Sequence, residues 1–145
     1  MPKISDALLA HYKAAHYQVF VPGDVLVFHI DAYSAALLEQ YAHFGVTSSA
    51  FLSAYNPRSR LTADAVNAAN QASLVAEVEK LGLPWIAGAA IDPVGQWPVE
   101  PSLLVLGISC AKAMNLVRKF EQNACVFIGA SGIPELLLSG LSSTE

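Results

Sequence analysis

Two short stretches of the chain concentrate side chains that could bind or react with a ligand. Residues 92–101, DPVGQWPVEP, place two carboxylates, one indole and three prolines between two apolar runs. Residues 56–59, NPRS, place an amide, a guanidinium and a hydroxyl directly after another apolar run. The first stretch is longer than a hairpin closure needs and is stiffened by its prolines, which is typical of a binding or catalytic loop.

These side chains have a chemistry that suits a small-ligand site. Asp92 and Glu100 could act as a general acid and base, or hold a cation weakly, if the loop brings them together and partly excludes water. Arg58 and the Ser59 hydroxyl could bind a carboxylate or a phosphate. The Trp97 indole could stack on a ring. The pattern therefore predicts a site for a small polar, anionic or nucleotide-like ligand, with or without proton-transfer chemistry.

Structural roles stay open for the same residues. Asn56-Pro57 and Asp92-Pro93 are dipeptides that often do no more than form turns. Glu100 could pair with Arg58, and Trp97 could serve only as a plug of its loop. In that case the loop would shape a surface for a protein partner or a second copy of the chain.

The other reactive residues form no recognised motif. The four histidines and two cysteines lack the spacing of a metal site. Cys110 stands at a predicted helix start, but no histidine is predicted beside it to activate the thiol. The sequence has no P-loop, no G-x-S-x-G and no G-x-G-x-x-G. It therefore demands no metal, names no cofactor and leaves open whether the protein is an enzyme.

Composition and charge narrow the classes of partner. The net charge is −4 and the eight Lys and Arg residues are scattered, so we do not expect nucleic acid as a partner. No apolar run reaches about twenty residues, so we expect no membrane span. The amino terminus lacks the apolar segment of a secretory signal, which favours a cytoplasmic protein. A share of 54% apolar and 14% charged residues favours a homodimer that covers one face.

The elements that must position the site follow from hydrophobic periodicity and turn residues. Helical spacing predicts helices over 4–16, 32–44, 62–81 and 110–122. Apolar and β-branched runs predict strands over 17–22, 25–30, 49–55, 85–91, 102–108, 124–128 and 133–138. The order α-ββ-α-β-α-ββ-α-ββ predicts an α/β fold, with α+β as the alternative, in which helices flank a single mixed sheet. We expect one domain over residues 1–145.

Strand direction predicts which polar residues meet. A helical crossover should make strands 49–55 and 85–91 parallel, so their carboxyl ends emerge at the same edge of the sheet. The strand over 102–108 returns antiparallel and therefore begins at that edge. The residues expected around one pocket mouth are Asn56, Arg58, Ser59, Asp92, Trp97, Glu100 and Ser102.

The chain also resembles a bacterial domain-of-unknown-function family, number 3293. The resemblance spans roughly residues 16–138 and rests on five stretches of sequence: YQVF from Tyr17, AFLSAYNPRS over 50–59, the helix with Asn67 and Leu74, DPVGQWP with EPSLLVLGI over 92–108, and FEQNA over 120–124. The signature positions of the family fall on Asn56, Pro57, Ser59, Asp92, Gly95, Trp97, Glu100 and Ser102. The resemblance therefore implies the same mouth that strand direction predicts, but no activity.

Overall fold

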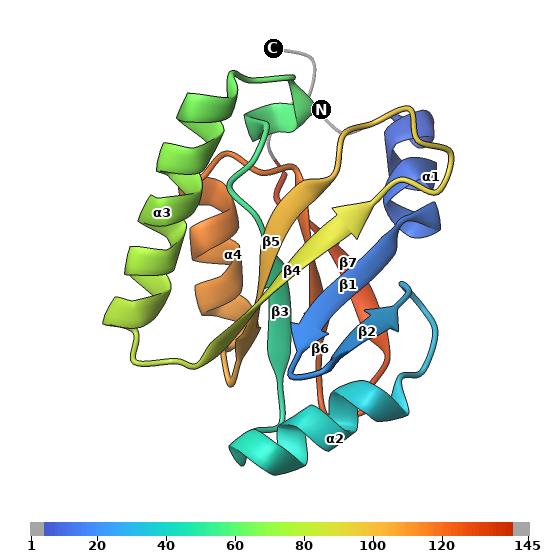
Figure 1. Cartoon of the computed structure of the whole chain (residues 1–145), viewed down its shortest axis with the longest axis vertical. Helices are drawn as coiled ribbons and strands as arrows, with labels where there is room; N and C mark the ends of the chain where they lie inside the picture. Colours follow the sequence, from blue (N-terminus) through green and yellow to red (C-terminus); the bar gives the residue numbers. More distant parts are fainter. Residues whose placement is uncertain (1–4, 141–145) are drawn as a thin grey trace.

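The computed structural model describes residues 5–140 and contains one seven-stranded sheet with helices on both faces (Figure 1). The helices are α1 (Asp6–Ala14), α2 (Ala35–Phe44), α3 (Asp64–Lys80) and α4 (Cys110–Lys119), with a short 3-10 turn η1 (Pro57–Ser59). The strands are β1 (His16–Val21), β2 (Asp24–Phe28), β3 (Ser49–Leu52), β4 (Trp85–Ile91), β5 (Glu100–Leu106), β6 (Ala124–Ile128) and β7 (Pro134–Leu138). Their order across the sheet is β2-β1-β4-β5-β3-β6-β7.

The predicted α/β class and the predicted order of elements are confirmed. Local signals set the helix boundaries: the hydroxyls of Ser5 and Ser109 accept hydrogen bonds from the backbone N–H groups of Leu8 and Lys112. Gly45 ends α2 with a φ of 68°, a conformation that glycine adopts without strain. The predicted start of the first helix at residue 4 and most of the tail over 139–145 lie outside the described residues.

The sheet differs from the expectation in one respect, because all of its neighbouring strands pair antiparallel and it is not mixed. The crossover through α3 skips one position in the sheet, and β5 fills that position by forming a hairpin with β4. Strands β3 and β4 still run in the same direction, with β5 between them. Their carboxyl ends and the start of β5 therefore share one edge, as predicted.

Strand β3 ends three residues earlier than the sequence suggests. After Leu52, the Ser53 hydroxyl donates to the Pro101 carbonyl, and the Ala54 N–H donates to the side chain of Gln71 on α3. These bonds replace the ladder of the sheet, so the chain leaves the sheet and turns toward α3. This early exit creates the polar turn over residues 53–60.

Two apolar layers lie on the two faces of the sheet. Buried side chains of α3 and α4 pack on one face, among them Leu74 and Leu116. On the other face, α2 packs Leu37 and Tyr41 against β1, β2, β3, β5 and β6. The Tyr41 hydroxyl donates to the Ile128 carbonyl, which places α2 at the end where β6 stops. Helix α1 lies toward the end where β3 and β4 stop, and this end carries the candidate site (Figure 1).

Candidate functional site

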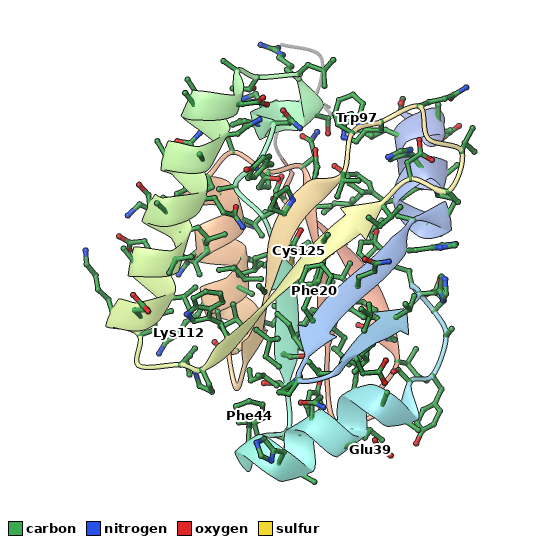
Figure 2. All side chains as sticks on the ribbon, viewed as in Figure 1. Phe20, Glu39, Phe44, Trp97, Lys112 and Cys125 are labelled. Carbon is green, nitrogen blue, oxygen red and sulfur yellow. The ribbon has the colours of Figure 1, made fainter. Side chains whose placement is uncertain are left out.

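A cavity of about 670 Å³ opens at the edge of the sheet where β3 and β4 end. Its walls come from α1 and the start of β1, from the end of β3 and the turn that follows it, from the loop between β4 and β5, from the start of β6, and from Leu136 of β7. Figure 2 shows Trp97 in that loop, at the end of the molecule that carries α1 and η1. All seven residues predicted at the mouth line the cavity: Asn56, Arg58, Ser59, Asp92, Trp97, Glu100 and Ser102.

Glu100 and Asn56, far apart in sequence, are in direct contact. The Nδ2 of Asn56 donates to Oε2 of Glu100 at 2.9 Å. The indole Nε1 of Trp97 donates to the same oxygen at 2.8 Å. One oxygen of the carboxyl group therefore receives two hydrogen bonds from neutral donors.

A network behind Asn56 fixes the orientation of its amide. The Thr62 N–H, which can only donate, points to Oδ1 of Asn56 at 3.0 Å. Asn67 on α3 donates from Nδ2 to the same Oδ1, and its own Oδ1 accepts the Asn56 N–H. Asn56 must consequently direct its NH₂ group at Glu100, so Oε2 of Glu100 is fixed as an acceptor.

This arrangement locates the proton of Glu100. Because Oε2 accepts from Asn56 and Trp97, a proton on the carboxyl group must reside on Oε1. Within residues 5–140, Oε1 has no hydrogen-bond partner and is not a fully buried atom, and Glu100 is one of the residues that line the cavity. Burial raises the pKa of the carboxyl group, against the lowering effects of both hydrogen bonds and of the charge on nearby His11. Glu100 can therefore exchange a proton with a bound molecule.

Asp92 holds the loop in shape. Its Oδ1 accepts the Val94 N–H, and its Oδ2 accepts the N–H groups of Gln96 and Trp97 at 2.9 Å each. The hydrogen bond from Val94 is the largest cause that lowers the pKa of this carboxyl group. Asp92 thus forms the turn that one interpretation of the sequence anticipated, and this turn places the Trp97 indole against Glu100.

The turn after β3 adopts a strained backbone. Asn56, Arg58 and Ser59 have φ values of 48°, 57° and 59°, a region that residues other than glycine rarely occupy. The Arg58 N–H is held by the Glu121 carbonyl at 2.7 Å, and the Ser59 N–H by the Asn56 carbonyl at 2.9 Å. Such strain clusters at binding and catalytic sites when the surroundings enforce it.

Arg58 and Ser59 have different partners from those considered in the sequence. The Nε of Arg58 lies 2.9 Å from a carboxylate oxygen of Glu121, so the pairing of Arg58 with Glu100 does not form. The Ser59 hydroxyl shares a hydrogen bond of 3.1 Å with the Tyr12 hydroxyl and accepts one from Asn123. This pair of hydroxyls joins α1 to the turn and supplies a second polar wall.

Ser102 serves the strand rather than the open space. Its side chain is buried, and its hydroxyl donates to the carbonyl of Glu100 at 3.0 Å. The bond stiffens the first residues of β5, where Glu100 is paired with Ala90 of β4. Ser102 therefore fixes the backbone that carries the carboxyl group.

Sequence reasoning missed the contribution of α1. His11 and Tyr12 of this helix line the cavity, and the Tyr17 hydroxyl donates to the Tyr12 carbonyl at 2.6 Å. Burial raises the pKa of the Tyr12 hydroxyl, so the phenol is neutral and can donate a hydrogen bond at neutral pH. The helical spacing of Tyr12 indicates an inward face, but no feature of the sequence says where the helix docks.

Residues 5–140 contain neither a cluster of metal ligands nor a helix that could span a membrane. No group of three or more His, Cys, Asp and Glu side chains in this range is placed to hold a metal ion. No helix within the same range has the length and apolar character to cross a bilayer.

Comparison with known proteins gives a match to a family model. A family model described as "Protein of unknown function (DUF3293)" matches residues 52–125, which is just over half of the chain. Neither the curated proteins nor the solved structures contain a match. The matched segment includes the turn after β3, the loop between β4 and β5, and Asn67, but not α1.

Proposed function

Because this chain belongs to the DUF3293 family, whose description assigns no activity, we propose from the geometry alone that the protein binds a small polar ligand in the cavity beneath α1. The observation that carries the proposal is the open Oε1 of Glu100 in a cavity whose walls come from five separate stretches of the chain. A volume of about 670 Å³ is within the range of small-molecule sites.

The walls divide into a polar part and an apolar part. Asn56 and Glu100 form one polar wall, and the hydroxyls of Tyr12 and Ser59 form the other. The apolar part comes from side chains of α1 and of the sheet: Leu8, Phe51, Ile91, Val126 and Leu136. A ligand with an apolar body and one or two polar groups would fit both parts.

The charge of the ligand is the least supported part of the sequence hypothesis. The sequence allows Arg58 to bind an anion, but in the structure its guanidinium lies against the Glu121 carboxylate. Arg60 also lines the cavity, at an exposed position. An anionic ligand would depend on Arg60, or on Arg58 leaving Glu121, so we propose a polar ligand without requiring a negative charge.

If the ligand is also converted, Glu100 is the group that moves the proton. Its Oε1 is the one position on this carboxyl group where a proton can enter or leave toward the cavity. Asp92 supports this role by holding the loop, with both carboxylate oxygens bound to backbone N–H groups. A reaction would therefore depend directly on Glu100 and indirectly on Asp92.

A thermal-shift screen against metabolites and nucleotides tests the binding proposal. A compound at one hundred times its Kd stabilises the folded chain by about 2.7 kcal/mol, which is easily detected. We expect the shift to disappear in Glu100→Gln and to persist in Glu135→Gln, because Glu135 is exposed and lies outside the cavity. Arg58→Ala would show whether the guanidinium contributes. A screen without a hit, or hits that Glu100→Gln leaves unchanged, would contradict the proposal.

A second candidate is a surface for another protein or for a second copy of the chain. Phe20 on β1 and Val25 on β2 are paired across the two strands. Each of these residues, like Val27 on β2, has nearly half of its surface exposed to solvent. Trp97 is less suited to such a role than expected, because its indole is tied to Glu100 inside the loop. Sedimentation of the native chain over a wide concentration range tests self-association, which a persistent monomer would contradict.

A further inference from the structure

Glu100 has no cation as a direct partner among residues 5–140. Its two hydrogen bonds come from an amide and an indole, both of which are neutral. The ion pairs that form in this range involve Glu121 and Glu77 instead. A carboxylate removed from water without a countercharge is unfavourable, and it attracts any cation that can reach it.

None of the described groups that face Glu100 forms an ion pair with it. His11 on α1 acts on the carboxyl group electrostatically but makes no ion pair with it. Tyr12 and Tyr17 are neutral phenols whose hydroxyls are used in other hydrogen bonds. Asp92, Arg58, Arg60 and Cys125 complete the set of titratable or charged residues at the cavity. Of the two arginines, Arg58 is bound to Glu121 and Arg60 is an exposed side chain.

Aromatic rings line the same cavity as Glu100. Trp97 and Tyr12 line the cavity together with His11, and the imidazole of His11 lies 6.3 Å from the indole and 6.4 Å from the phenol ring, centroid to centroid. Aromatic rings stabilise an organic cation through their π systems, while a carboxylate fixes its position. A carboxylate beside a tryptophan and a tyrosine is therefore suited to a positively charged nitrogen.

We propose that the ligand is an organic amine or guanidine whose cationic nitrogen pairs with Oε1 of Glu100, while its apolar body lies against Leu8, Phe51 and Leu136. This inference rests on the proposed binding function and specifies the class of ligand. It replaces the anionic ligand of the sequence hypothesis, because Glu100 and not Arg58 presents the open charge.

The Glu100→Gln variant removes the charge with little disturbance of the fold. The fixed donors, Nδ2 of Asn56 and Nε1 of Trp97, require an acceptor, so the glutamine carbonyl oxygen takes the place of Oε2. The NH₂ group then occupies the place of Oε1 and faces the cavity. The variant thus presents a neutral N–H donor at the position where the native chain presents an acceptor oxygen. A cationic ligand cannot pair with this donor.

The experiment compares probes that share a body and differ in charge. Native protein, Glu100→Gln and Glu135→Gln are titrated calorimetrically with 2-phenylethylamine, 2-phenylethanol and phenylacetate, and with hexylamine and agmatine as further cations. We expect at least one cation to bind more tightly than the alcohol and phenylacetate. Its affinity should fall at least about tenfold in Glu100→Gln and stay unchanged in Glu135→Gln. Binding should also strengthen as the pH rises through the ionisation of Glu100.

The outcomes separate the two proposals. Equal cation affinity in native protein and Glu100→Gln overturns the inference, as does tighter binding of phenylacetate or 2-phenylethanol. If a compound of the wider screen still binds in a Glu100-dependent way, the proposed function survives without the amine. If none of the five probes and no compound of the screen binds, both proposals are overturned.

Discussion

Folding buries the Glu100 carboxyl group, which makes its ionised form unfavourable. The residues around it hold the group in place with hydrogen bonds. Asn56 and Trp97 fix one oxygen, and Asn67 fixes Asn56. Each of these side chains is a neutral hydrogen-bonding group, so the network orients the carboxyl group without neutralising it. A charged group that is oriented by hydrogen bonds but has no ion-pair partner is a frequent feature of binding and catalytic sites.

The pH dependence of stability should reveal this cost directly. Burial raises the pKa of Glu100, so the folded state binds its proton more tightly than the unfolded chain does. The contribution of protonated Glu100 to the free energy of unfolding is complete below the pKa of the unfolded chain, about 4.3. This contribution is lost as the pH rises through the higher pKa of the folded state. Glu100→Gln stays neutral, so we expect it to melt at a higher temperature than the native chain at pH 7, with the difference vanishing toward pH 4.

Glu135→Gln provides the matched control for this melting experiment. Because Glu135 is exposed, this substitution should leave the melting temperature unchanged both at pH 7 and at pH 4. A native chain that is more stable than Glu100→Gln at pH 7 would show that the ionised carboxylate is stabilising, contrary to this expectation.

At the residue scale, the sequence predicted seven of the residues that line the cavity but not their hydrogen-bond partners. Strand direction places Asn56 and Glu100 at one edge, which is a property of topology and needs no side-chain detail. The partner of Arg58 depends on where Glu121 falls after α4, and the sequence pattern does not specify this. Asn67 was marked only by the family resemblance, since an asparagine within a helix carries no signal of burial.

At the element scale, α1 is a wall of the cavity that buries little of itself against the rest of the molecule. None of its nine residues is fully buried, and its attachment relies on Tyr12 and on the bond from the Tyr17 hydroxyl to the Tyr12 carbonyl. Elements with few buried contacts open at low free energy. We therefore expect α1 to open more readily than the strands.

Tyr17→Phe tests the attachment of α1. The ring of Tyr17 stacks on Phe28 at 5.3 Å and meets Phe51 edge-on at 5.4 Å, and phenylalanine preserves both contacts. Only the hydroxyl is lost, with an expected cost of about 1 kcal/mol. We expect amide hydrogen exchange to accelerate in residues 6–14 while the strands keep their protection. Uniform acceleration across the sheet would mean that Tyr17 supports the whole fold and not α1 in particular.

The elements themselves were predictable because their signals are local. Serine caps, Gly45 and alternating apolar residues fix where helices and strands form, and the order of elements is confirmed. Two features depend on distant contacts and were not predictable: the place of β5 between β3 and β4, and the docking of α1 over the cavity. Both are decided by which surfaces meet once the sheet has formed.

At the scale of the whole molecule, the two apolar layers share the same strands. Neighbouring residues of β5 point to opposite faces, so Leu103 belongs to the layer with α3 and α4, and Leu104 to the layer with α2. Neither layer can keep its packing if the central strands separate. We therefore expect residues 1–145 to behave as one domain, as the length of the chain suggests.

Matched substitutions in the two layers test this cooperativity. Leu37 on α2 and Leu74 on α3 are both almost completely buried, and each belongs to a different layer. Truncation to alanine should cost about 2–5 kcal/mol at either position, through lost burial and an unfilled cavity. Because the layers share β3, β5 and β6, we expect each variant to show one calorimetric transition at a lower temperature, with equal calorimetric and van't Hoff enthalpies. Two transitions, of which Leu37→Ala lowers one and Leu74→Ala the other, would show that the faces of the sheet unfold independently.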